Sequence, residues 1–222
     1  MRVYVVLLLL ALVANGQAHL LDRLTARLFN VGDDQPWFCH DADCPSFQVD
    51  KRVGDYYEIR SYPETKWAGI IEAGSKFELA ISKGFASLYR YFDGANDQSK
   101  KMPMTEPVLS RIKPVNGFRT SETNYTISFY LLDEFQKQDP PKPTNNAIKV
   151  FTLPASKIYM TAFGGFATEG AILKTAAGLL EHLKKDKLPV QEDYFYFASY
   201  DPPTRIKERH NEVWFLSKAP GS

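Results

Sequence analysis

The sequence predicts an α+β fold in which a strand–helix–strand unit occurs twice and both helices pack against a closed or strongly curved sheet. Three observations predict it: a gapless match between residues 59–70 and 150–161, two amphipathic helical patterns at corresponding places, and strands with large residues on both faces. Because 44% of the 222 residues are hydrophobic and 14% are aromatic, the chain can bury the core of one large domain.

The N-terminus has the features of a secretory signal peptide. Arg2 precedes the apolar stretch VVLLLLALV, which is followed by the small and polar residues ANGQA, and this run is too short to anchor the chain in a bilayer. We expect residues 1–16 to be removed, with cleavage after Ala18 as the alternative, leaving a secreted, extracellular protein. Removal of Arg2 takes the formal net charge from +1 to zero. Nucleic acid and anionic membranes are therefore poor partners, and no later stretch is apolar enough to span a membrane.

In a secreted protein, the two cysteines are expected to form a disulfide and one sequence motif is expected to accept a glycan. Cys39 and Cys44, in FCHDADC, most simply form one disulfide across a small loop in an oxidising compartment. Zinc would need four ligands, and only His40 and two aspartates are nearby. Residues 17–46 are otherwise expected to be irregular, apart from a short helix in LLDRLTARLF. Asn124, in the motif Asn-Tyr-Thr, is the expected glycan acceptor.

The internal repeat sets the order of the elements. The stretches IRSYPETKWAGI and VFTLPASKIYMT align Pro63 with Pro154, and each is typical of a strand, a tight turn and a strand. The same offset places the first predicted helix over the second. It also places Met104 over Phe195, where we expect a third strand to begin in each half. The polar, proline-rich QKQDPPKPTNN between the halves is a connector.

Two helices follow from periodic apolar residues. The first is expected to begin at a capping box, Ser75-Lys76-Phe77-Glu78, and to end at Asp93-Gly94. The second has Thr168 as its N-cap and ends before Pro189. The apolar stripes expected to face a sheet are Phe77, Ile81, Phe85, Leu88 and Phe92 in the first helix and Ile172, Ala176, Leu179 and Leu183 in the second.

Three strands are predicted over residues 125–132, 194–200 and 211–217, which are rich in aromatic and β-branched residues at a period of two. The segment KMPMTEPV is expected to bend into a strand, because its prolines fix the turn. We interpret Met102 and Met104 as packing residues. Thioether ligation to iron is the alternative, and it predicts a low-spin spectrum that Met102→Ala or Met104→Ala would abolish.

Five motifs together resemble the SOUL haem-binding protein family, closest to its haem-binding protein 2 branch. In order, they are YYEIRSYPETKWA, YFDGAND, KMPMTEPV, YFASYDPP and RHNEVWFL. The resemblance runs from about Cys44 to Lys218, so we expect one domain over residues 47–218. It implies a twisted, distorted antiparallel β-barrel of two pseudo-repeated halves, each flanked by one α-helix. It also implies reversible binding of haem or another tetrapyrrole through an apolar groove beside the first helix.

The resemblance assigns the ligand-binding residues. Aligning YFDGAN with the family motif places porphyrin contacts on Phe85 and Tyr89 and a propionate-binding base on Arg90. A second basic position, after the D-P-P turn, is Arg205. At 100° per residue, Phe85 and Tyr89 lie towards one edge of the apolar stripe, where a ligand could reach them. The alternative is that Phe85 belongs to the core, Tyr89 is a boundary aromatic and both arginines are solvated.

Two departures from the family pattern remove an iron ligand and a base. The histidine of the family motif Y-E-I-R-H-Y is Ser61 here, and a further basic position on the first helix is Ser82, although Lys83 is adjacent. The four histidines, His19, His40, His182 and His210, are expected to be solvated or hydrogen-bonded. We therefore expect no metal ligand in the protein and a haem that is held by its periphery.

The expected function is that of a secreted, monomeric tetrapyrrole carrier or scavenger. One alternative is an extracellular structural or interaction protein that keeps the fold without haem. An enzyme is not expected, because the sequence has no G-x-S-x-G or H-E-x-x-H motif and no clustered metal ligands, and the disulfide leaves no thiol nucleophile. We assign no catalytic residue, although Glu58, Glu106 and Glu212 are candidate buried acids.

Overall fold

A computed structural model describes residues 35–73, 76–114 and 124–218. The chain divides into two units, Met1–Pro36 and Trp37–Ser222, and the elements described below belong to the second. The expected signal peptide, the expected helix in LLDRLTARLF and Ser75 lie outside the described residues. Within the described ranges, no helix is both long enough and apolar enough to cross a membrane.

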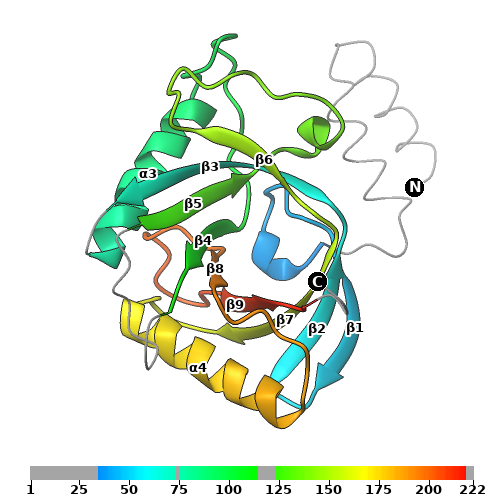
Figure 1. Ribbon diagram of the computed structural model, residues 1–222. Coiled ribbons are helices and arrows are strands. Elements are labelled where there is room, and N and C mark those ends of the chain that lie inside the picture. Colours follow the sequence, from blue (N-terminus) through cyan, green and yellow to red (C-terminus); the bar gives the residue numbers. More distant parts are fainter. Residues whose placement is uncertain (1–34, 74–75, 115–123, 219–222) are drawn as a thin grey trace, which may run out of the picture. The chain divides into compact units, whose positions relative to one another are not determined.

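Nine strands in the described part of the chain form one antiparallel sheet that curls into a half-barrel (Figure 1). Their order along the sheet is β1-β2-β7-β9-β8-β4-β5-β3-β6. The strands are β1 (Gln48–Val53), β2 (Tyr57–Tyr62), β3 (Thr65–Ala73), β4 (Val108–Ile112), β5 (Asn124–Tyr130), β6 (Lys149–Leu153), β7 (Ser156–Phe163), β8 (Phe195–Ser199) and β9 (Asn211–Leu216). The predicted α+β fold with a distorted antiparallel barrel is thus confirmed.

The strand order confirms the predicted repeat. From β2 to β6 the order is symmetric about the central pair of β4 and β8, so that β2-β7-β9-β8 mirrors β6-β3-β5-β4. Strands β2 and β3, which the turn at Pro63 joins, pair with β7 and β6 of the other half and not with each other. The third strand begins at Phe195 in the second half as predicted. In the first half it begins at Val108 and not at Met104, because Pro103 and Pro107 cannot donate to a strand ladder.

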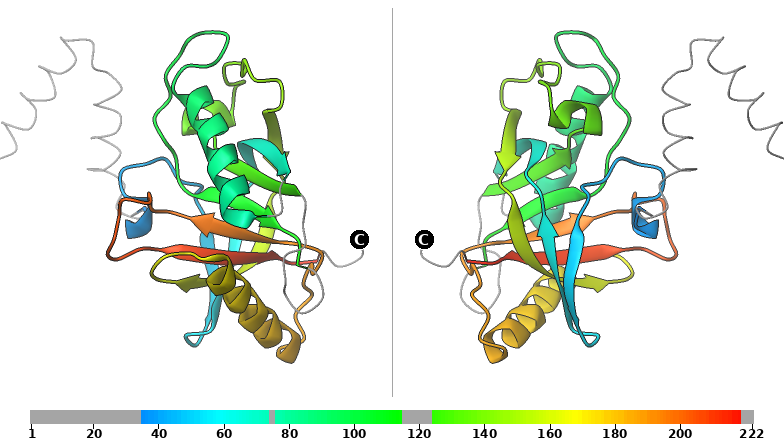
Figure 2. Two further views of the ribbon diagram at one scale, coloured as in Figure 1. Left: turned by 90° about the vertical axis from the view of Figure 1, so that its left-hand side faces the viewer. Right: turned by 90° about the vertical axis from the view of Figure 1, so that its right-hand side faces the viewer.

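Each half places one helix on the outer face of the sheet (Figure 2). Helix α3 (Phe77–Phe92) packs on β3 and β5, and α4 (Glu169–Lys185) packs on β7 and β9. Thr168 caps α4 as predicted, since its side chain accepts a hydrogen bond from the Ala171 amide at 3.2 Å. The predicted capping box is wrong, because Lys76 is the N-cap of α3 and its side chain makes no capping bond.

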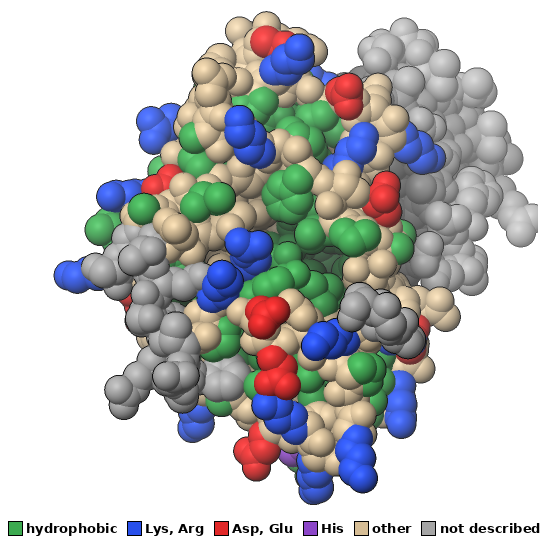
Figure 3. All heavy atoms as spheres, viewed as in Figure 1, with side chains coloured by type: hydrophobic (Ala, Val, Ile, Leu, Met, Phe, Trp, Pro, Cys, Tyr) green, Lys and Arg blue, Asp and Glu red, His purple; other side chains and the backbone are tan. Residues whose placement is uncertain are grey.

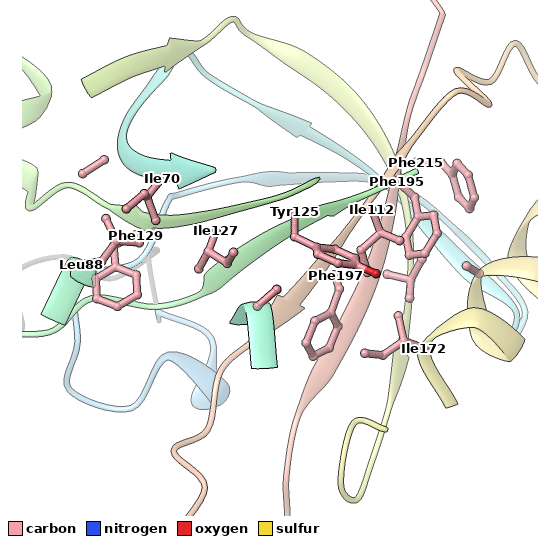
Figure 4. Packing of buried hydrophobic residues seen from close by; sticks show 14 of the residues in the cluster. Ile70, Leu88, Ile112, Tyr125, Ile127, Phe129, Ile172, Phe195, Phe197 and Phe215 are labelled. Atoms are coloured by element: carbon pink, nitrogen blue, oxygen red, sulfur yellow. The ribbon is translucent and has the colours of Figure 1, made fainter. Parts of the chain in front are cut away.

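The sheet separates two hydrophobic cores. Because side chains alternate along a strand, one set lies under the helices and the other lines the inside of the half-barrel. The outer core, part of which Figure 4 shows, includes Ile70, Leu88, Ile127, Phe129, Ile172, Phe197 and Phe215. The inner core includes Phe38, Cys39, Trp67, Leu109, Tyr130, Ile158, Met160, Tyr200 and Trp214. The large residues predicted on both strand faces are therefore buried on both sides of the sheet.

Candidate functional site

The predicted ligand-contacting side chains on α3 lie next to each other. The rings of Phe85 and Tyr89 are nearly parallel, with centroids 6.2 Å apart and an interplanar angle of 13°. Phe85 is half-buried and its ring contacts Phe129 of β5 edge-on. Tyr89, by contrast, is 47% exposed. The two side chains form one aromatic surface, and Tyr89 provides its solvent-facing part.

The two predicted basic residues lie in different surroundings. Arg90 is exposed beside Tyr89, and its Nε donates to the Ala86 carbonyl of the same helix at 3.2 Å. Arg205 lies on the connection between β8 and β9, where its Nε is 3.2 Å from Asp201 Oδ1. Its guanidinium also approaches His40, at 3.5 Å. Arg90 therefore shares helix α3 with the predicted aromatic residues, whereas Arg205 belongs to an ion-pair cluster on another connection.

Each histidine that the structure describes is engaged with a neighbour. The partners are Asp201 for His40, at 3.1 Å, Tyr56 for His182, with ring centroids 4.4 Å apart, and Glu212 for His210, at 2.7 Å. The fourth, His19, lies outside the described residues. The contacts of His40 and His210 each use the Nε2 atom, and a ring nitrogen that carries no such bond can still act as a metal ligand.

The other candidate iron ligands also have contacts with neighbouring residues. The Ser61 hydroxyl donates to Asp50 at 2.8 Å. Met102 is 5% exposed within the outer core and Met104 packs against it, which confirms both as packing residues. Among the residues that the structure describes, no group of three or more His, Cys, Asp or Glu side chains could hold a metal ion.

The predicted disulfide is present and closes a loop inside the half-barrel. Cys39, the last residue of a short 3-10 helix, η1 (Trp37–Cys39), is bonded to Cys44, with Cα atoms 6.0 Å apart. Phe38 is 7% exposed, and its ring stacks on His210 with centroids 4.0 Å apart and an angle of 3°. Figure 1 shows this segment, in blue, within the ring of strands. The cystine loop, residues 37–44, therefore contributes to the inner core.

A buried carboxylate lies beneath the cystine loop. Glu212 is fully buried, and its Oε1 is 3.1 Å from Arg60 Nη1 and 2.7 Å from His210 Nε2. Its Oε2 accepts from Trp214 Nε1 at 2.6 Å and from the Tyr200 hydroxyl at 3.1 Å. Burial alone would raise the pKa of Glu212, but the hydrogen bond from His210 and the charge of Arg60 hold that pKa below its ordinary value. A carboxylate accepts about four hydrogen bonds, so this one has no free position for a substrate.

The sequence contains a signal for this network, from which Glu212 alone was predicted to be buried. Arg60 and Glu212 are charged residues inside strands that are otherwise apolar and aromatic. A charge in a buried strand has to be paired, which selects both residues. Their pairing with each other was not predictable, because it depends on which strands are neighbours.

Glu106 is a second unusual acid. Its Oε2 is buried without a hydrogen-bond partner within the described residues. Burial and the nearby Asp201 carboxylate raise the pKa of Glu106 to about 8, and Arg205 opposes this. A carboxyl group of that pKa suits general acid–base chemistry. Both cysteines of the chain are in the disulfide, so no thiol nucleophile accompanies it.

An open hollow of about 590 Å³ lies beside the cystine loop, between the connection from β7 to α4 and that from β8 to β9. Its lining residues are Trp37, Ala162, Phe163, Gly164, Glu208, Arg209 and His210. Trp37 is 63% exposed, and the Arg209 guanidinium lies 5.0 Å from the centroid of the neighbouring Phe166 ring. This hollow was not predictable from the sequence, because three segments that are distant in the chain form it.

Comparison with known proteins places these features in context. The model of the family described as "SOUL heme-binding protein" matches residues 42–216. Similar curated proteins include human "Heme-binding protein 2", 32% identical over 162 residues, which covers 73% of this chain and 78% of that protein. Xenopus laevis "Heme-binding protein 1" is 33% identical over 166 residues, covering 75% and 86%.

Similar solved structures include the C-terminal domain of EcmrR, with a TM-score of 0.53 and 10% identity over 78% of this chain and 99% of that domain. At this identity the likeness shows a shared fold alone.

Proposed function

Because the chain belongs to the SOUL heme-binding protein family, we propose that it reversibly binds haem or a related tetrapyrrole on the exposed aromatic surface of α3. The observation that supports this site most directly is the near-parallel pair Phe85 and Tyr89, and Arg90 is an exposed base on the same helix. Both relatives carry names that state haem binding. Tyr89 presents its ring to solvent, so it is available to a flat ligand.

The free energy of such binding has to come from the porphyrin ring and its propionates. Covering roughly 200 Å² of one porphyrin face contributes about 5 kcal/mol, and association costs about 4 kcal/mol or more. A charge-assisted hydrogen bond from Arg90 to a propionate adds about 1.5 to 3 kcal/mol. One porphyrin face and one arginine therefore leave about 2.5 to 4 kcal/mol, which corresponds to roughly millimolar affinity, and micromolar affinity of about 8 kcal/mol requires that the second porphyrin face is covered as well. In both cases we expect binding that requires the propionates and does not require iron.

The 590 Å³ hollow is a second place for the same ligand. It combines the exposed Trp37 with Phe163, which offer apolar faces to a tetrapyrrole. The guanidinium of Arg209 also lines the hollow, but it is buried and donates to three backbone carbonyls. A hollow also covers more of a ligand than a flat helix face does. Binding there would make Trp37, and not Tyr89, the decisive side chain.

A titration with hemin, followed by Soret absorbance, tests the function and separates the two places. The variant Tyr89→Ala should weaken binding about tenfold, whereas Tyr56→Ala, which removes an equally exposed tyrosine near α4, should have no effect. Arg90→Gln should weaken hemin and the iron-free protoporphyrin equally. If Trp37→Ala weakens binding instead, the hollow is the site. If neither the wild-type protein nor any variant shows a saturable Soret shift, the proposed function fails.

We further propose that the protein is secreted and acts as a monomeric carrier or scavenger, without catalysis. The apolar stretch after Arg2 and the Cys39–Cys44 disulfide support secretion. Asn124 is exposed at the start of β5, where a glycan can be attached. Expression of the full chain in animal cells should release a product that begins after Gly16 or Ala18 and that loses mass on enzymatic deglycosylation. Retention of the product in the cell would contradict this.

The alternative role is an extracellular structural or interaction protein that keeps the fold without a ligand. It is supported by Ser61 in place of the family histidine. Pigment in material purified from the native source would favour the carrier. Colourless material that fails to bind hemin would favour the alternative.

A further inference from the structure

The inside of the half-barrel is not completely filled. A cavity of about 120 Å³ lies between the turn that joins β2 to β3, the turn that joins β6 to β7, and strands β8 and β9. Its walls belong in part to the inner core, which the cystine loop completes with Phe38 and Cys39. Figure 3 shows an apolar hollow near the middle of the face that looks into the sheet. The cavity is therefore the remaining space of a lumen that the cystine loop otherwise helps to fill.

The walls of this cavity are mostly apolar and largely aromatic. The residues that line it include Tyr62, Trp67, Leu153, Tyr196, Trp214 and Leu216, together with the polar Thr65 and Ser156. The hydrogen-bonding atoms of both tryptophans point elsewhere, because Trp67 Nε1 donates to Thr65 at 2.9 Å and Trp214 Nε1 donates to Glu212 at 2.6 Å. Of the hydroxyl groups in the lining, that of Thr65 accepts the bond from Trp67 and that of Ser156 donates to the Pro154 carbonyl at 2.8 Å. The walls are therefore mostly apolar, with the tyrosine hydroxyls as their remaining polar groups.

An apolar space of this size is unusual in a packed interior. Folded proteins contain few voids larger than a water molecule, and apolar cavities of about 150 Å³ stay dry and take up benzene-sized molecules. A tetrapyrrole is several times too large for this space. A single aromatic ring matches both its volume and its walls, since aromatic pairs gain from edge-to-face and offset contacts.

We propose that this cavity is a binding site for a small apolar molecule with one aromatic ring. The site is separate from the α3 surface and from the 590 Å³ hollow, because it shares no lining residue with either. The ring enters between the two turns and packs against Trp214 and Tyr62, whose own centroids are 5.1 Å apart. The protein then has two ligand classes, one on its surface and one in its lumen.

Fluorobenzene, observed by 19F NMR line broadening, is the probe for this site. The wild-type, disulfide-intact protein should bind it saturably in the submillimolar range, and should bind it about threefold or more tightly than fluorocyclohexane. The variant Leu216→Phe fills the cavity from a half-buried position and should weaken binding about tenfold or more. The matched variant Leu79→Phe makes the same change at an exposed leucine of α3 and should leave binding unchanged.

Thermal unfolding of both variants controls for damage to the fold, and Leu153→Phe provides a second filling variant if Leu216→Phe unfolds at a lower temperature. Tyr89→Ala and saturating hemin should leave fluorobenzene binding unaltered, so failure of this site and failure of tetrapyrrole binding are distinguishable. The proposal is overturned if binding is not saturable, if Leu79→Phe weakens it as much as the filling variants do, or if fluorocyclohexane binds equally well.

Discussion

Phe38 should be a principal anchor of the cystine loop, and its replacement by alanine tests this directly. The ring is 7% exposed and lies between His210, at 4.0 Å, and Tyr200, at 4.7 Å, while the Arg60 guanidinium is 5.9 Å from its centroid. Burying roughly 150 Å² of aromatic surface at about 25 cal/mol/Å² contributes about 4 kcal/mol. Phe-to-Ala changes in cores cost about 3 to 5 kcal/mol, so Phe38→Ala should lower the free energy of unfolding by about 4 kcal/mol.

Urea denaturation followed by circular dichroism measures this loss, and the neighbouring residue supplies the control. Trp37 is adjacent in sequence and also aromatic, but it is 63% exposed, so Trp37→Ala should cost about 1 kcal/mol or less. A loss below about 1 kcal/mol for Phe38→Ala would refute the reasoning. It would mean that the loop does not hold the inner core together.

Three further predictions concern the charged residues and the disulfide. Glu212→Gln removes the charge that faces Arg60 inside the protein and should cost about 3 kcal/mol in urea denaturation at pH 7, whereas Glu58→Gln, at a partly exposed pair, should cost much less. Because the pKa of Glu106 is raised to about 8 in the folded protein, the folded state holds this proton more tightly. The stability that it contributes is present below about pH 4.5 and is lost as the pH rises towards about 8, so Glu106→Gln should flatten the decline of unfolding free energy over that range. An unchanged decline would place the titrating group elsewhere. Replacing Cys39 and Cys44 together by alanine opens a loop of only a few residues and should cost about 2 kcal/mol by loop entropy; a loss no larger than that of a surface substitution would show that packing alone holds the loop.

Local features of the fold were predictable because they depend on residues close together in the chain. The stripe of α4, with Ile172, Ala176, Leu179 and Leu183 all buried, follows from helical periodicity alone. Thr168 was predicted as a cap because its side chain needs only the amide three residues later. The capping box at α3 was wrong for the same kind of reason, since the motif is permissive and the helix begins at Phe77.

The candidate site was predictable only in part. The spacing of Phe85 and Tyr89 on one helix sets their stacking, so these two could be grouped without a structure. Arg205 could not be assigned to a partner, because its neighbours Asp201 and His40 meet only when the connection between β8 and β9 lies beside the cystine loop.

By itself, the sequence determined the repeat, the two helices, the disulfide, the family and the residues of the α3 surface, because each rests on periodicity, spacing or a motif. The tertiary structure decided that β2 and β3 pair with the opposite half, that Arg60 meets Glu212 across 152 positions of sequence, and that the cystine loop fills the lumen beside a small aromatic cavity. The physical reason is that a period of two tells which face of a strand is buried and says nothing about which strand lies next to it. Contacts that cross the sheet are set by strand order and register, and these are settled only when both halves of the chain fold together.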